Sequence, residues 1–260
     1  MRRIGRYVGP MSVTEPSPVA VLLDAGGVFL LPDQERILGA FARAEVAVDR
    51  AGLDDAHYAG AARFTTSLDA EADWNACWNE YLDGYVEFLG VATDAATDES
   101  RELHRHLDSE FADTGLWTRI APGSVEGFRA LAANGVRLGM VSNADGLMAE
   151  RMRELEILQV GPGVGVTVEC VIDSGAVGVT KPDPRIFRIA LDAMGIADVD
   201  AGRVWYVGDM PGIDVVGARR AGLRPFLVDP LARHRDADHD CVGSLTELAA
   251  RVARVSQVAG

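Results

Sequence analysis

Five short apolar segments alternate with helical patterns along this 260-residue chain. They are predicted to be strands, at residues 19–23, 136–141, 168–172, 203–207 and 224–228. Strands that alternate with helices are typical of a parallel, doubly wound sheet, because each connection between parallel strands crosses back through a helix. Nearly half of the residues are apolar, which supplies a sizeable core. The sequence therefore predicts an α/β fold.

Residues 33–115 differ from the rest of the chain in charge and in pattern. They hold 19 acidic residues and six arginines, which gives −13 of the net charge of −14. They contain no convincing strand, and helices are predicted around residues 35–46, 71–89 and 99–111. We therefore predict an all-helical domain inserted into the α/β core. The predicted parts are a flexible leader at 1–18, the core at 19–32 and 116–260, and the insert at 33–115.

The spacing of the cysteines and the net charge restrict the cellular compartment and the class of binding partner. Cys77, Cys170 and Cys241 lie far apart and lack the paired spacing of metal ligands, which predicts free thiols in a reducing cytoplasm. No apolar run approaches the length needed to span a membrane. The acidic balance argues against nucleic acid or another polyanion as a partner. We expect a soluble monomer or homodimer that binds a small molecule.

Polar residues follow three of the predicted strands. Asp24 ends the apolar run VAVLLD, Ser142 and Asn143 end GMVSN, and Asp209 ends VWYVGD. In doubly wound sheets, ligands bind at the carboxyl ends of the strands. These side chains are therefore predicted to meet at one edge of the sheet.

Glycines and a helix start add features of an anion site. Gly26 and Gly27 follow Asp24 and allow the backbone to approach a ligand closely. Residues 145–148 are predicted to begin a helix, whose free N–H groups favour anions. Both features suit a phosphate group.

Lys181 is the single lysine beside 24 arginines, in the string GVTKPDPRIF. Lysine is a compact point charge, whereas arginine is a planar fork, so a lone lysine in such a chain favours a tight anion site. Asp183 and Pro184 are a plausible N-cap and first-turn proline, which places Lys181 just ahead of a helix. Together with the strand-end residues, Lys181 predicts a phosphate site.

The motifs DAGGV, SN, TKPDPRIF and VGDMPGIDVVGARRAG occur in this order along the chain. Each motif alone is common, but four in this order and spacing are specific. The chain resembles the haloacid dehalogenase-like (HAD) hydrolase superfamily over roughly residues 19–230. The resemblance is to phosphatase-like members with a helical, C1-type cap directly after the first motif. It implies a Rossmann-like core, and the insert at 33–115 is then the cap.

The resemblance implies a phosphatase mechanism with Mg²⁺ as the cofactor. Asp24 is then the nucleophile, which attacks phosphorus to form an aspartyl-phosphate that water cleaves. Mg²⁺ is expected on the carboxylates of Asp24 and Asp209 and on the backbone carbonyl of Gly26, with Asp214 supporting the metal or its waters.

The remaining motif residues are expected to bind the phosphoryl group. The hydroxyl of Ser142 is expected to bind a phosphoryl oxygen, and Lys181 to neutralise charge as the transition state forms. Backbone N–H groups near Gly26, Gly27 and Asn143 are expected to help. The expected substrate is a small phosphorylated metabolite.

One departure from the family pattern concerns the proton donor. Most phosphatases of the superfamily carry an aspartate two residues after the nucleophile as general acid and base, and here that residue is Gly26. Its loss is expected to lower turnover by roughly a hundredfold to ten-thousandfold. Three explanations stay open, namely a good leaving group, a proton donor from the cap, or slow turnover.

Two alternatives to a phosphatase also stay open. A 2-haloacid dehalogenase needs no proton for its halide and no metal, but Asp209 and Asp214 have the spacing of metal-binding members. The aromatic residue that dehalogenases carry two positions after the nucleophile is absent. A phosphate-binding scaffold without catalysis is the other alternative, and the retention of Asp24 and Lys181 argues against it.

Substrate choice is expected to lie in the cap. Residues that are candidates for its mouth are His57, Tyr58, Arg63, Trp74 and Trp78. The two tryptophans are four residues apart and are expected to pack on one helix face, while His57 and Arg63 are expected to be exposed or ion-paired. Closure of the cap is expected to exclude water from the reaction.

Overall fold

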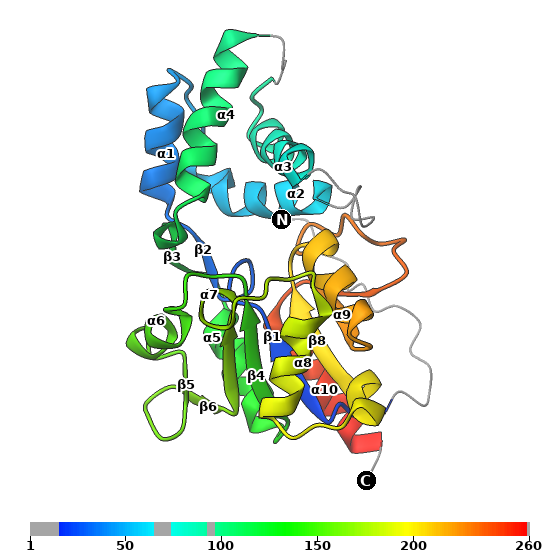
Figure 1. The fold of residues 1–260 in the computed structure, drawn as a ribbon. Coiled ribbons are helices and arrows are strands. Elements are labelled where there is room, and N and C mark those ends of the chain that lie inside the picture. The colour runs from blue at the N-terminus through cyan, green and yellow to red at the C-terminus, as the bar shows by residue number, and fades with distance from the viewer. Residues whose placement is uncertain (1–15, 65–73, 93–96, 259–260) are drawn as a thin grey trace.

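A six-stranded parallel sheet forms the centre of the computed structural model, which describes residues 16–64, 74–92 and 97–258 (Figure 1). The strand order is β10-β9-β8-β1-β4-β7. The strands are β1 (Ala20–Leu23), β4 (Arg137–Ser142), β7 (Cys170–Asp173), β8 (Val204–Gly208), β9 (Arg224–Val228) and β10 (Asp240–Val242). The sheet confirms the predicted doubly wound α/β fold. Most of the predicted leader, residues 1–15, lies outside the described residues.

Both faces of the sheet are covered by helices, because alternate residues of each strand point to opposite faces. Val21 and Leu23 of β1 join one apolar cluster, while Ala20 and Leu22 join the other. The first face packs against α5 (Ser124–Ala133), α6 (Met148–Glu154) and α10 (Leu245–Val258). The second face packs against α8 (Pro184–Ala193) and α9 (Val216–Arg220). The core therefore lies in two layers around the sheet.

Two antiparallel strands, β2 (Leu30–Pro32) and β3 (Trp117–Ile120), join the core to the helical cap. The predicted cap boundaries, residues 33 and 115, fall beside this strand pair. The cap helices are α1 (Gln34–Arg43), α2 (Leu53–Arg63), α3 (Trp74–Phe88) and α4 (Asp98–Phe111). In Figure 1 they stand above the carboxyl ends of the core strands, so the cap faces the predicted site.

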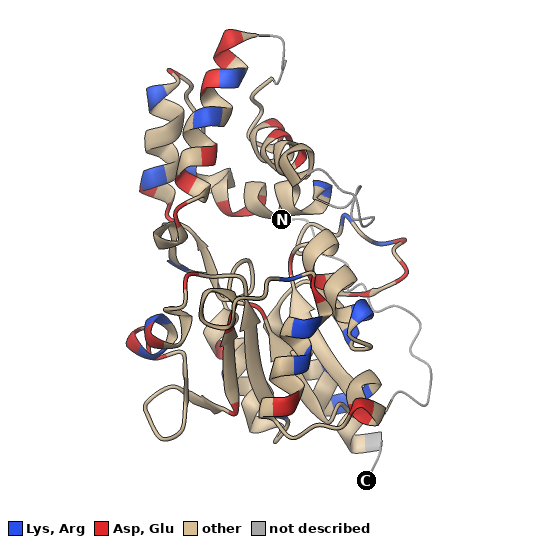
Figure 2. Ribbon diagram, in the orientation of Figure 1, with Lys and Arg blue, Asp and Glu red and all other residues tan. Residues whose placement is uncertain are grey.

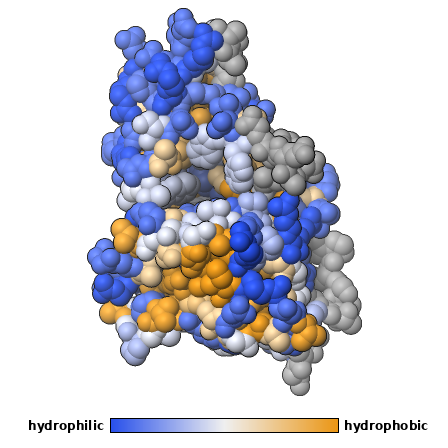
Figure 3. Space-filling model, in the orientation of Figure 1, coloured by the Kyte–Doolittle hydropathy of each residue, from blue (hydrophilic) through white to orange (hydrophobic). Residues whose placement is uncertain are grey.

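The cap has its own apolar centre and a charged exterior. Its cluster of buried side chains includes Phe41, Tyr81, Tyr85, Leu107 and Phe111. Figure 2 shows acidic and basic residues spread over the outer helices, and Figure 3 shows a mostly hydrophilic cap above a core face with hydrophobic side chains in view. The starts of α1 and α4 are capped, because Asp33 accepts from the N–H of Arg36 and Thr97 from that of Ser100.

The structure also contains elements that the sequence pattern did not predict. The cap helix α2 has apolar residues on most sides, so its sequence lacks a single apolar stripe. The predicted strand at 168–172 is two strands, β6 (Val166–Val168) and β7, of which β6 pairs with β5 (Leu158–Val160). The short strands β2, β3 and β10 were also missed.

The remaining elements of the described residues are short. They are 3₁₀ turns at Arg50–Gly52, Thr114–Leu116 and Asp198–Arg203, a π turn at Pro211–Val215 and the helix α7 (Ser174–Val177). Within this part of the chain, none of the helices combines the length and the apolar character needed to span a membrane.

Candidate active site

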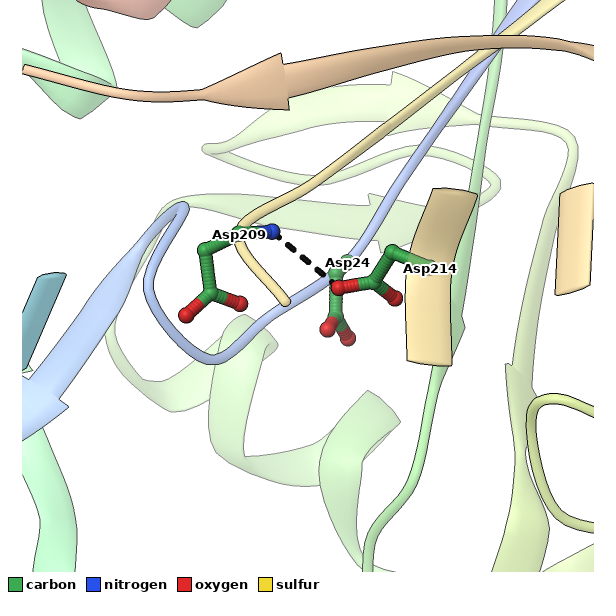
Figure 4. Close-up of side chains that lie close together, drawn as sticks. All are labelled: Asp24, Asp209 and Asp214. Carbon is green, nitrogen blue, oxygen red and sulfur yellow. Dashed lines mark hydrogen bonds between the residues drawn. The ribbon is translucent and has the colours of Figure 1, made fainter. Parts of the chain in front are cut away.

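The strand-end residues meet because their strands are neighbours. Strand β1 lies between β4 and β8, so Asp24 after β1 comes close to Ser142 at the end of β4 and Asp209 after β8. Figure 4 shows Asp24, Asp209 and Asp214 with their side chains close together. One carboxylate oxygen from each lies within 4.8 Å of the others, and all three residues are buried. The sheet therefore brings three carboxylates to one point.

The loop after Asp24 requires glycine at residue 27. Gly27 has a φ of +65°, and a Cβ atom there would lie 2.1 Å from Cγ of Asp209. The Gly27 N–H donates to the carbonyl of Leu30 at 2.8 Å. This N–H is therefore engaged within the loop, and glycine at this position allows the close approach of the loop to Asp209.

Lys181 lies at the centre of the site and is almost fully buried. Its Nζ lies 2.6 Å from Oδ2 of Asp24, 2.8 Å from Oδ1 of Asp214 and 2.8 Å from the hydroxyl of Tyr206. The side chain of Asn143 holds the Lys181 main chain, accepting from its N–H at 2.8 Å and donating to its carbonyl at 3.1 Å. Asn143 therefore positions the lysine.

The helix after Lys181 begins as predicted. Asp183 is the N-cap of α8 and accepts from the N–H of Arg185, and Pro184 is the first helical residue. The other predicted helix start lies slightly later, because α6 begins at Met148. The Met148 N–H donates to the side chain of Asp173 at 3.0 Å, so a neighbouring carboxylate already occupies this donor.

Asp214 links the lysine to the loop that carries Asp209. Its Oδ1 accepts from Lys181 Nζ and from the hydroxyl of Tyr206. Its Oδ2 accepts from the N–H of Asp209 at 3.1 Å, as Figure 4 shows, and from the N–H of Met210 at 2.9 Å. Because both of its oxygens accept hydrogen bonds, Asp214 fixes the positions of Lys181 and Asp209.

Burial and charge shift the pKa values of the site in a consistent way. Burial raises the pKa of Asp24 to about 7, with Lys181 opposing the rise and the neighbouring aspartates adding to it. Burial also raises the pKa of Asp209. Burial alone acts to lower the pKa of Lys181, but Asp214 and Asp24 outweigh it and raise this pKa. The site thus has three carboxyl groups, those of Asp24, Asp209 and Asp214, beside the single ammonium group of Lys181.

A divalent cation fits this excess of negative charge. Three buried carboxylates face the single ammonium of Lys181, and carboxylate oxygens are the ligands that Mg²⁺ prefers. Asp214 is the least free of the three, because each of its oxygens accepts from two donors, whereas each oxygen of Asp24 has one partner. The donor set therefore suits a metal held by Asp24, Asp209 and backbone oxygen.

The cap reaches into the site through its second helix, α2. His57 is fully buried, and its Nε2 lies 2.8 Å from Oδ2 of Asp209 while its Nδ1 lies 2.9 Å from the hydroxyl of Tyr81. The tautomer with its proton on Nε2 satisfies both contacts. Tyr58 donates its hydroxyl to the carbonyl of Gly27 at 2.8 Å. Of the two settings expected for His57, exposed or ion-paired, the structure shows contact with an acidic partner, Asp209.

Trp117 occupies the space beside Gly26, where most phosphatases of the superfamily carry the general acid. A Cβ atom built on Gly26 would lie 3.5 Å from Cζ3 of the Trp117 ring. The ring of His57 also packs edge-on against that indole, with 5.3 Å between the ring centres. Any side chain at residue 26 would thus point at an apolar ring rather than at open space.

A pocket of about 130 Å³ opens onto the charged residues. Its polar lining includes Asp24, Ser142 and Lys181, and its apolar walls include Trp117 and Ile213. Such a volume is small for a ligand site and suits a compact molecule. The pocket places Ser142 beside the predicted nucleophile and lysine.

The residues predicted at the cap mouth do not line this pocket. Arg63 pairs with Glu87, as expected for an ion-paired arginine. Trp78 stacks on Tyr81 with 4.6 Å between ring centres, whereas Trp74 is about half exposed. The sequence did not predict that His57 and Tyr58 form hydrogen bonds with the core. The one hint of such a contact was a histidine within the Ala- and Gly-rich helix α2.

Two curated phosphatases are similar to this chain in sequence. Phosphoserine phosphatase of Thermus thermophilus is 35% identical over 180 residues, which cover 68% of this chain and 65% of that protein. Phosphoglycolate phosphatase of Rhodospirillum rubrum is 33% identical over 141 residues, or 54% of each chain. The chain thus spans less than two thirds of the length of these curated relatives.

Solved structures and a family model extend the match. The crystal structure of a HAD-superfamily hydrolase from Ehrlichia chaffeensis shares the fold, with a TM-score of 0.58 at 14% identity over 94% of this chain and all of the other. The family model for haloacid dehalogenase-like hydrolases matches residues 19–222. This match covers most of the chain and contains all four motifs and the inserted cap, so the protein belongs to the haloacid dehalogenase-like hydrolases.

Proposed function

We propose that this protein is a Mg²⁺-dependent phosphatase that acts on a small phosphorylated molecule through an aspartyl-phosphate. The observation that carries this proposal is the 2.6 Å contact between Asp24 and Lys181, inside a pocket that Ser142 also lines. The relatives named phosphoserine phosphatase and phosphoglycolate phosphatase support phosphoryl transfer. A cytoplasmic location and a monomeric or dimeric state stay predictions of this proposal.

The proposed reaction begins with attack by Asp24. One of its carboxylate oxygens forms a bond to phosphorus while the bond to the leaving oxygen breaks. Lys181 balances the charge on the phosphoryl oxygens, and the Ser142 hydroxyl donates to one of them. Water then attacks phosphorus, which releases inorganic phosphate and restores Asp24. A bound Mg²⁺ supplies further neutralisation of the phosphoryl charge.

The pocket offers the leaving group little help with its proton. Besides Asp24, Asp209 and Asp214, no carboxylic acid and no imidazole line the pocket among the described residues. Gly26 stands where the usual acid would be, against the ring of Trp117. We therefore favour substrates whose leaving group departs without protonation, such as acyl, anomeric or aryl phosphates.

Phosphate release from a panel ordered by the leaving-group pKa tests the proposal. The assay compares the wild-type protein with Asp24→Asn, in the presence of Mg²⁺ or of a chelator. We expect release to need the metal, to fall about a thousandfold or more in Asp24→Asn, and to be about a hundredfold faster for aryl than for alkyl esters. Equal values of kcat/KM across the panel would contradict departure without protonation, because kcat/KM reports the step in which the leaving group departs.

The two alternatives give different outcomes in matched assays. Halide release from 2-chloropropionate that persists in chelator would identify a dehalogenase. Binding of phosphate or vanadate without release of phosphate from any ester would identify a phosphate-binding protein. Either outcome rejects the phosphatase.

A further inference from the structure

Arg151 lines the pocket and takes no part in the proposed reaction. It lies on α6, the helix that follows Ser142 and Asn143, and its side chain is 21% exposed. Its Nη1 atom is buried and has no hydrogen-bond partner among the described residues. A buried N–H donor without a partner costs about 1–3 kcal/mol, so the position calls for an acceptor that the protein itself does not provide.

The guanidinium of Arg151 is held in place from its other side. Its Nη2 donates to Oδ2 of Asp145 at 3.2 Å. Asp145 is in turn fixed by the hydroxyl of Thr114 at 2.7 Å and by the N–H of Leu147 at 3.1 Å. The arginine therefore has one nitrogen anchored by Asp145, while Nη1 has no acceptor among the described residues. A fixed arginine of this kind loses less entropy when it binds an anion.

The pocket lining contains two cations with different surroundings. Lys181 contacts Asp24, and Ser142 also lines the pocket. Arg151 is the only other cationic residue of the pocket lining that the structure describes, and the lining also includes the apolar side chains of Leu30 and Met210. Lys181 is already balanced by two carboxylates, whereas the single carboxylate of Asp145 shares its oxygens among three donors.

We infer that Arg151 is a specificity residue that binds a second anionic group of the substrate, a carboxylate joined to the phosphate by a short linker. This inference rests on the proposed phosphatase function of the pocket. It assigns the phosphoryl group to Lys181 and Ser142, and the carboxylate to the guanidinium of Arg151. The pocket volume of about 130 Å³ limits the linker to a few atoms.

Binding of two non-hydrolysable ligands tests the inference without any need for turnover. Phosphonoacetate carries a phosphonate and a carboxylate, and phosphonoacetamide has the same shape with a neutral amide. Isothermal titration in the presence of Mg²⁺ compares their dissociation constants. We expect the wild-type protein to prefer phosphonoacetate by about tenfold to a hundredfold, the usual range for a hydrogen bond to a charged group.

Two arginine variants locate the preference. Arg151→Met is expected to bind both ligands equally. Arg153→Met is the matched control, because Arg153 lies on the same helix, is 63% exposed and has Glu150 as its partner at 3.9 Å; it is expected to keep the full preference. If thermal melting shows that Arg151→Met is not folded, Arg151→Lys is used in its place. This variant keeps the positive charge but loses the planar guanidinium.

Each binding result either supports the carboxylate site at Arg151 or rejects it. Equal binding of the two ligands by the wild-type protein, no binding of either, or a preference that survives in Arg151→Met would overturn the carboxylate site. Loss of phosphate release in the ester panel leaves this binding test intact, so failure of the phosphatase proposal is seen separately.

Discussion

The α/β core and the helical cap treat their charged side chains in opposite ways. In the core, Asp24 and Lys181 are buried in contact with each other, and burial raises the pKa of Asp24. In the cap, most ion pairs lie near the surface, and Arg43 and Arg36 hold the pKa of Glu110 below its usual value although burial acts to raise it. The core thus concentrates charge for chemistry, whereas the cap distributes charge over its solvated exterior.

The largest difference is expected between the buried and the exposed cation. Lys181→Met leaves two buried carboxylates without their partner, so we expect a loss of about 3–5 kcal/mol in stability and of about a hundredfold to a thousandfold in turnover. Arg36→Met removes half-exposed pairs to Glu110 and Asp113, for which we expect less than about 1 kcal/mol. Urea unfolding and phosphate release measure both. Similar losses in the two variants would contradict the comparison.

The next comparison uses two glycines of positive φ. Gly27→Ala in the core adds a Cβ atom that overlaps Asp209, so we expect at least about a hundredfold loss of turnover from the displaced carboxylate. Gly90→Ala in the cap has nothing within 4 Å of the added atom, so only backbone strain of about 1–2 kcal/mol is expected. Kinetics and thermal melting of both variants test this. Unchanged turnover in Gly27→Ala would show that the loop can move aside.

The contact between the cap and the core is expected to matter less than the core charges. His57→Ala removes the cap side chain that bonds Asp209, and we expect about a tenfold to a hundredfold loss of activity or of Mg²⁺ affinity. His104→Ala, on α4 near Asp83, is the control within the same domain. Titration of activity with Mg²⁺ measures the effect, and equal behaviour of the two variants would remove His57 from the site.

The smallest effect concerns pH and the cap surface. Because the pKa of Glu110 is lower in the folded protein than its ordinary value of about 4.5, its ion pairs stabilise the cap above that value. This contribution disappears as the pH falls through that value and the lower folded pKa. The stability difference between wild-type and Glu110→Gln, about 1 kcal/mol or less at pH 7, should therefore shrink towards pH 4. A constant difference would show that the charge of Glu110 is not involved.

Much of the fold could be predicted because it depends on local patterns. The five main strands and three of the four cap helices follow from periodicity in short windows. The helix α2 was missed because its buried residues lie on several sides, which removes the periodic signal. Strands β2 and β3 are three and four residues long and were missed because their pairing joins segments about 90 residues apart.

The sequence by itself determined the order of strands and helices and the polar residues at the strand ends, because backbone geometry fixes which side chains leave a strand at its carboxyl end. It also marked Lys181 as unusual. Only the tertiary structure decided that His57 bonds Asp209, 152 residues away, and that Asp214 engages both its oxygens with its neighbours. Such contacts depend on how the cap and the loops pack, and a linear pattern carries no information on packing angles or on which atoms remain without partners.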